Sequence, residues 1–241
     1  MCKSVRHMAW TMWLTLGAAL AISVVPAAHA GFDEAMVDFR TGNITAAFKQ
    51  FLVAAEGGDR NAQAMVANMY LEGTGTTRDV RRASAWFEQA AAGGHSYAQY
   101  VLGLLYLSGQ GVHKDTARGV TWLERSAQQG SYFAQTTLGD AYANGTGVAI
   151  DKARAASYFT SAANQNYATA QLKLASVHFL GLGVARNPVE AYKWAYLAAM
   201  QLTSAGSIVQ QFRAELSAAQ VAQGEAAAKA WLSAKGISRS R

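Results

Sequence analysis

The chain has 241 residues, of which 51% are hydrophobic, 15% are charged and 2 are proline; this length suits one sizeable domain or one solenoid. The formal net charge is +6, but the sequence contains no Lys/Arg cluster that could follow a phosphate backbone, which argues against nucleic-acid binding. Abundant alanine and glycine with almost no proline favour closely packed helices separated by glycine turns.

Residues 1–30 have the pattern of a signal peptide. Lys3 and Arg6 form a basic start, an apolar stretch follows over residues 8–25, and Ala28-His29-Ala30 supplies a small-x-small cleavage pattern. Gly31 is then the expected first residue of the mature chain. An uncleaved membrane anchor is the alternative interpretation. No later segment is apolar enough to span a bilayer, so we expect no membrane span after cleavage.

The only cysteine, Cys2, lies inside this predicted signal. It precedes the apolar stretch, so it is not placed for lipid attachment. The mature chain would therefore reach an oxidising compartment without disulfides, and its stability must come from packing. We expect a periplasmic protein, with secretion into the medium as the second possibility.

Residues 31–57 predict a capping hairpin. Helical patterns extend over residues 32–41 and 44–56, and Phe39-x-x-Gly42 resembles the later Tyr70-x-x-Gly73 with a shorter loop after it. A degenerate first unit is expected at the end of a repeat array, because a terminal unit has a neighbour on one side only.

Residues 58–203 contain a repeat with a step of 36 residues. Seven columns keep this step without an insertion, and chance does not produce seven columns at one spacing. The columns are Ala55, Ala91, Ala127, Ala163 and Ala199; Ala62, Ala98, Ala134 and Ala170; Gln63, Gln99, Gln135 and Gln171; Tyr70, Tyr106, Tyr142 and His178; Gly73, Gly109, Gly145 and Gly181; Gly75, Gly111, Gly147 and Gly183; and Trp86, Trp122, Tyr158 and Trp194.

Each repeat predicts two helices, as the second repeat illustrates. Ala98 and Tyr106 share one face of the first helix at helical spacing. Gly109 and Gly111 end that helix, because glycine takes the left-handed conformation without steric cost. We expect small residues such as Ala98 to let the two helices of a hairpin approach, and large residues such as Tyr106 and Trp122 to fill the space between hairpins.

The second helix of each repeat has its own start and stop signals. Asp115 is expected to cap its N-terminus, with Asp79, Asp151 and Asn187 at the equivalent positions. Gly130 ends it, and the fourth repeat has Asn166 there, which also tolerates a left-handed turn. One such hairpin has too little apolar surface to fold alone, so neighbouring hairpins must share a core.

Residues 204–241 are expected to form C-terminal capping helices and a frayed tail. Helical patterns extend over residues 207–216 and 218–234, and the polar, basic tail of residues 236–241 is expected to fray.

The pattern Trp86-Phe87-x-x-Ala90-Ala91, followed by Gly94-His95-x-x-Ala98-Gln99-x-x-Leu102-Gly103-x-x-Tyr106-x-x-Gly109-x-Gly111-Val112-x-x-Asp115, resembles the Sel1-like repeat. The resemblance is close over residues 46–199. It implies an all-α fold, a right-handed α-solenoid of stacked helical hairpins related to tetratricopeptide repeats. It also implies a scaffold that binds a protein partner and needs no cofactor. A cysteine-rich branch of the family is linked to β-lactam binding or hydrolysis, but this chain lacks the paired cysteines of that branch.

The sequence shows no catalytic or metal-binding constellation. His95, His113 and His178 fall in different repeats without a short metal-ligand spacing. His178 replaces a packed tyrosine, and we expect it to be a hydrogen-bonded core residue. The loop at Gly73–Thr77 lacks the Gly-Lys-Ser/Thr ending of a phosphate loop. We therefore predict no catalytic residue and no metal site.

The predicted binding surface is the concave side of the solenoid. By analogy with tetratricopeptide hairpins, the first helix of each hairpin lines that side, and its non-repeating positions face the groove. These positions also include Ala64, Leu107 and Thr136; an alternative is that Leu104, Leu107 and Phe179 pack against the next hairpin. The candidate partner-binding residues are Asn61, Asn68, Tyr97, Tyr100, Leu104, Phe133, Asp140 and Phe179.

These observations predict a periplasmic protein–protein interaction scaffold or regulator that binds its partner in the concave groove. The alternative is a secreted factor that contacts host or surface molecules. A β-lactam or cell-wall hydrolase is a third, weaker hypothesis, because no catalytic cluster supports it.

Overall fold

The computed structural model describes residues 27–237, and their side chains from residue 31 onward. Within this range the chain forms twelve α-helices and no strand. The predicted signal residues Lys3, Arg6 and Cys2, and the end of the basic tail, lie outside the described residues. Helix α1 begins at Ala27, so the expected cleavage point after Ala30 falls in its first turn.

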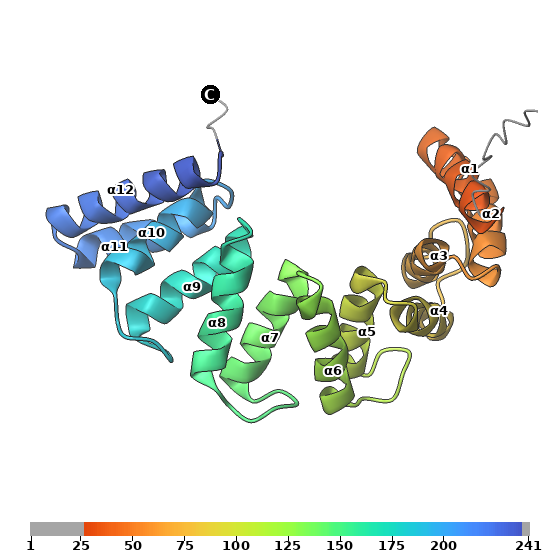
Figure 1. The fold of residues 1–241 in the computed structure, drawn as a ribbon, viewed down its shortest axis with the longest axis horizontal. Coiled ribbons are helices and arrows are strands. Elements are labelled where there is room, and N and C mark those ends of the chain that lie inside the picture. The colour runs from red at the N-terminus through yellow and green to blue at the C-terminus, as the bar shows by residue number, and fades with distance from the viewer. Residues whose placement is uncertain (1–26, 238–241) are drawn as a thin grey trace, which may run out of the picture.

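The helices follow one another as hairpins in an α-solenoid of repeats, as the sequence predicts. Figure 1 shows an open arc with α1 at one end and α12 at the other. From α1 to α11 each helix packs against its neighbours in the chain, and α12 packs against α10; contact between neighbours is the arrangement of a quasi-one-dimensional array. The helices are α1 (Ala27–Thr41), α2 (Ile44–Glu56), α3 (Arg60–Glu72), α4 (Val80–Ala92), α5 (Ser96–Ser108), α6 (Thr116–Gln128), α7 (Tyr132–Asn144), α8 (Lys152–Ala163), α9 (Ala168–Leu180), α10 (Pro188–Ala199), α11 (Ala205–Glu215) and α12 (Ala218–Ala234).

The predicted start and stop signals of the helices are confirmed. The Asp115 side chain accepts the Arg118 backbone N–H at 2.9 Å and caps α6. Gly109 ends α5 in the left-handed conformation at φ +77°. Asn166 has a φ of +64°, at the position where Gly130 has +89°. The equivalent caps of α4, α8 and α10 are Asp79, Asp151 and Asn187.

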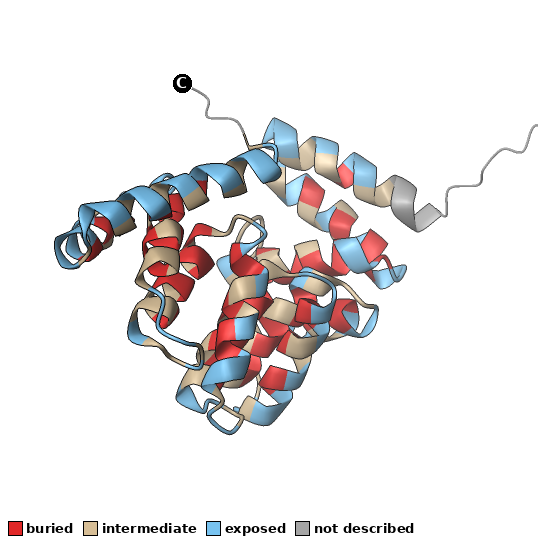
Figure 2. Cartoon of the chain, turned by 60° about the vertical axis from the view of Figure 1, so that its left-hand side comes forward, coloured by how far each residue is buried: buried red, intermediate tan, exposed pale blue. Residues whose placement is uncertain are grey.

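The apolar core lies between the hairpins, with one correction to the sequence-based prediction. Figure 2 shows buried residues where helices meet and exposed residues on outward faces. The column that begins with Trp86 and Trp122 is only half-buried, and Trp194 is its buried member. The next position along each second helix fills the core instead: Phe87 and Leu123 are 0% exposed. The rings of Trp86, Trp122 and Tyr158 therefore cover the core rather than form it.

The glutamine column has a structural role that explains why it repeats. Gln99 is 5% exposed, and its Nε2 donates to the Ala91 carbonyl oxygen at 3.1 Å. Its Oε1 accepts from Nε2 of Gln129 at 2.7 Å. The same bond to a repeating alanine carbonyl recurs at Gln63, Gln135 and Gln171. A buried glutamine amide on the first helix of one hairpin thus donates a hydrogen bond to a carbonyl group in the last turn of the preceding hairpin.

The closing helices complete the core at the C-terminal end. The Cβ of a residue at Gly224 would lie 2.8 Å from the Tyr192 ring, so α12 approaches α10 closely. Ser217 forms a capping box with Gln220 at the start of α12. Among the helices of residues 27–237, none is long and apolar enough to cross a membrane.

Candidate functional site

The predicted partner-binding residues lie at or near the surface of the first helices. Tyr97 is 43% exposed and Phe133 is 37% exposed. The other six are exposed or half-buried: Asn61, Asn68, Tyr100, Leu104, Asp140 and Phe179. Ala64 and Thr136, which the same helical spacing placed on this surface, are 4% and 6% exposed. That part of the prediction is wrong, because both side chains point into the helix packing.

Five rings form a continuous surface cluster across three hairpins, and we call it the aromatic face: Tyr97, Tyr100, Tyr132, Phe133 and Tyr167. Tyr100 on α5 stacks on Phe133 of α7, with centroids 5.6 Å apart and planes 25° apart. Phe133 in turn contacts Tyr167, the N-cap residue of α9, at 5.3 Å. Successive first helices are therefore joined ring to ring.

Polar atoms border the aromatic face. The Tyr97 hydroxyl donates to Oδ1 of Asn68 on α3 at 3.1 Å. Burial raises the pKa of the Tyr97 and Tyr100 hydroxyls, so both remain protonated and able to donate at neutral pH. The face thus combines large apolar area with hydrogen-bonding tips, which is the usual composition of a protein-binding hot spot.

Asp140 lies further along α7 and faces a separate hollow. Its Oδ1 pairs with Nζ of Lys173 on α9 at 2.8 Å. Both residues line a cavity of about 480 Å³ between α7, α8 and α9, with Phe159 and Lys152 on its wall. The charge of Asp140 is therefore compensated within the protein.

Sequence reasoning missed Tyr132 and Tyr167, and Phe179 makes a ring contact that lies outside the predicted groove. Tyr132 and Tyr167 occupy the first helical position and the N-cap of their helices, whereas the spacing argument began at the second helical position, as at Phe133. Phe179 stacks on Phe212 of α11 at 4.2 Å with planes 10° apart. It packs against the closing helices, which is the alternative that the sequence left open.

The Sel1 repeat family matches four consecutive segments, residues 60–95, 96–131, 133–167 and 168–201. These segments make up more than half of the chain. The chain belongs to the Sel1 repeat family.

Solved structures agree with this assignment. A Sel1 repeat protein from Oxalobacter formigenes superimposes with a TM-score of 0.69 at 26% identity, over 75% of this chain and 79% of that one. A putative Sel1 repeat protein from Klebsiella pneumoniae superimposes with a TM-score of 0.51 at 21% identity, over 78% of this chain and 97% of that one. No curated protein sequence matches the chain. Sel1 repeat proteins are in general scaffolds for protein–protein interactions.

The histidines of this Sel1 repeat protein have separate environments. His95 caps α5, because its Nδ1 accepts the Ala98 backbone N–H at 3.2 Å. Burial lowers the pKa of His95 and of His178. Nδ1 of His178 is buried without a hydrogen-bond partner, so the expectation that it is hydrogen-bonded is wrong for this atom. Among the described residues no group of three metal-ligating side chains comes together.

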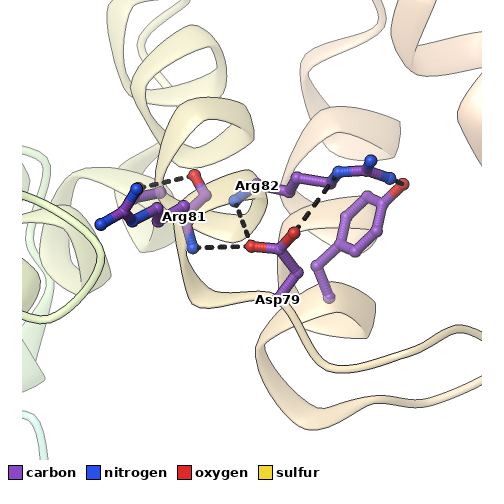
Figure 3. Close-up of polar contacts among 5 residues, drawn as sticks. Asp79, Arg81 and Arg82 are labelled. Carbon is purple, nitrogen blue, oxygen red and sulfur yellow. Dashed lines mark hydrogen bonds and ion pairs between the residues drawn. The ribbon is translucent and has the colours of Figure 1, made fainter.

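A second repeating arrangement lies at the starts of the second helices. Arg82 pairs with Asp79 at 3.4 Å, as Figure 3 shows, and its guanidinium carbon lies 5.7 Å from the centroid of the Tyr70 ring. Arg118 repeats the stacking on Tyr106 with a centroid distance of 4.5 Å. Burial and the hydrogen bond to Glu88 raise the pKa of Tyr106 to about 12, so its hydroxyl stays neutral. Arg82 and Arg118 thus interact with tyrosine and carboxylate side chains of the repeats themselves.

Proposed function

We propose that this Sel1 repeat protein is a periplasmic interaction scaffold that binds a protein partner on its first helices, with the aromatic face at the centre of the site. One observation carries the proposal: five rings in contact cover three successive hairpins at positions where the repeat does not fix the residue type. A repeat scaffold needs its repeating columns for packing, so non-repeating exposed aromatic residues are available for recognition.

Contacts between successive first helices support the placement of this face on the inner side of the arc. Rings join α5 to α7, the Tyr97–Asn68 hydrogen bond joins α3 to α5, and the Lys173–Asp140 pair joins α7 to α9. In a curved stack the helices on the inner side lie closer to one another than those on the outer side. The proposed groove therefore runs along the first helices in the arc of Figure 1.

We expect the double substitution Tyr97→Ala and Tyr100→Ala to weaken partner capture by about tenfold or more, because exposed aromatic anchors dominate binding energy. The measurement is quantitative capture from envelope extract with purified wild-type and variant protein. Ile150→Ala is the matched control, since Ile150 is 63% exposed in a loop away from the aromatic face. Equal capture by all three proteins would contradict the proposed site, and a large loss of thermal stability in the double variant would show that the rings serve the core.

The proposed compartment is tested separately. Cell fractionation should place the chain in the periplasm, shortened by about 3 kDa if the signal peptide is removed after Ala30. Recovery from the culture medium would instead favour the secreted factor. Full-length protein in the membrane fraction would favour the anchor.

A further inference from the structure

An open pocket of about 690 Å³ lies where the loop after α5 meets the first turn of α4. Its wall carries the side chains of Arg81, His113 and Lys114 together with Ser108 and the glycines of the loop. Arg81 comes from one hairpin and the other two side chains come from the next. The site is therefore assembled only when the hairpins stack, and no sequence motif reveals it.

The two cations of this pocket, Arg81 and Lys114, are not held by ion pairs within the part of the protein that the structure describes. Within residues 31–237, neither Arg81 nor Lys114 takes part in an ion pair. Asp79 lies two residues before Arg81 and Asp115 directly follows Lys114. The Asp79 carboxylate accepts the backbone N–H groups of Arg81 and Arg82 at 3.0 Å. Figure 3 shows the Arg81 and Arg82 side chains leaving α4 in opposite directions, with only the Arg82 guanidinium returning to Asp79.

The loop that carries His113 and Lys114 is held rigidly against α4. Ser84 Oγ donates to the Gly111 carbonyl oxygen at 3.1 Å. The Asp115 backbone N–H donates to the Tyr106 carbonyl oxygen at 3.0 Å and closes the loop. The Asp115 carboxylate accepts the Arg118 backbone N–H, so it serves the helix start. The backbone of the loop is therefore already in place, and binding of a ligand has to order only the exposed side chains of Arg81, His113 and Lys114.

The other repeats provide an internal comparison. The loops have the same length and the same left-handed glycines, but the loop after α5 has His113 and Lys114 and meets Arg81 of α4. The equivalent positions are Ala149 and Ile150 in the loop after α7 with Ala117 on α6, and Ala185 and Arg186 in the loop after α9 with Ala153 on α8. The other repeats adopt the same fold without these basic residues. The three basic side chains are therefore not needed for the stacking of the hairpins.

We propose that this pocket binds a phosphate group, either free or as part of a larger anionic molecule such as a phospholipid. An arginine fork and a lysine point charge on neighbouring walls are side chains whose charge and N–H donors suit a phosphate oxyanion. The pocket volume is in the range of small-molecule sites. The phosphate site uses the loop edge of the solenoid and residues outside the aromatic face, so it is independent of the proposed partner site.

The test is an NMR titration of the isotope-labelled chain with inorganic phosphate, at about 50 mM salt because higher ionic strength screens exposed charges. Saturable shifts of the backbone amides of residues 109–114 are expected. The triple variant Arg81→Ala, His113→Ala and Lys114→Ile carries the side chains of the equivalent positions Ala117, Ala149 and Ile150, so it should fold. It should bind phosphate at least about tenfold more weakly than the wild type. Arg82→Ala removes one positive charge outside the pocket and should bind within about twofold of wild type.

Vesicles distinguish the source of the phosphate. If the group belongs to a lipid, vesicles containing phosphatidylglycerol should bind the wild type and not the triple variant, while phosphatidylcholine vesicles bind neither. Shifts by inorganic phosphate without vesicle binding would assign the site to free phosphate or a soluble ester. Equal phosphate binding by wild type and triple variant, equal losses in the triple and Arg82 variants, or no shift and no vesicle binding would each overturn the proposal.

Discussion

Replacing Gly111 with alanine is expected to lower the free energy of unfolding by about 2 to 4 kcal/mol. Gly111 has a φ of +72°, and a Cβ there would lie 2.4 Å from the carbonyl oxygen of Val80. That oxygen belongs to the backbone of α4, so it cannot move aside as a side chain would. The loop between two helices must then shift away from the neighbouring hairpin, and the buried contacts between the two hairpins weaken. Urea unfolding followed by circular dichroism measures the loss.

Gly130→Ala is the matched control for this prediction. Gly130 has a φ of +89°, but nothing lies within 4 Å of its Cβ position. Only the backbone conformation is unfavourable, so we expect a loss of about 1 kcal/mol. Equal losses at Gly111 and Gly130 would mean that close approach of the loop to α4 contributes nothing to stability.

The repeating columns made the fold predictable, because each column has one physical task in every hairpin. Gly109 ends a helix, Asp115 begins the next, and Gln99 satisfies a buried carbonyl group. Because each task needs the same residue type in every hairpin, these residues recur at a constant spacing in the sequence. The relative importance of Gly111 was not predictable, because its constraint comes from Val80 in another hairpin.

The candidate site was predictable only in part. Helical spacing correctly placed Tyr97, Tyr100 and Phe133 near the surface. It could not place Tyr132 and Tyr167, which join the aromatic face from the helix starts and depend on the angle between hairpins. The Arg81, His113 and Lys114 pocket was missed for the same reason, since its residues are separated in the sequence and meet only across the stack.

Phe212→Ala is expected to lower the free energy of unfolding by about 3 to 5 kcal/mol, the usual loss for a buried phenylalanine. Phe212 is 4% exposed and stacks on Phe179 at 4.2 Å. Its ring joins α11 to α9, so its removal leaves a cavity where the closing helices cover the last repeat. Urea unfolding of the single and double alanine variants of Phe179 and Phe212 forms a double-mutant cycle, with an expected coupling of about 0.5 to 1.5 kcal/mol.

Leu180→Ala provides the control at the neighbouring position. Leu180 is 62% exposed, so its truncation should change stability by about 0.5 kcal/mol or less. The cycle also decides the role of Phe179, which the sequence placed among the partner-binding residues. A Phe179→Ala variant that retains full stability and loses partner capture would return Phe179 to the binding surface. A variant with reduced stability and unchanged capture would establish that the ring closes the array, since a stacked pair loses its contact energy when either ring is removed.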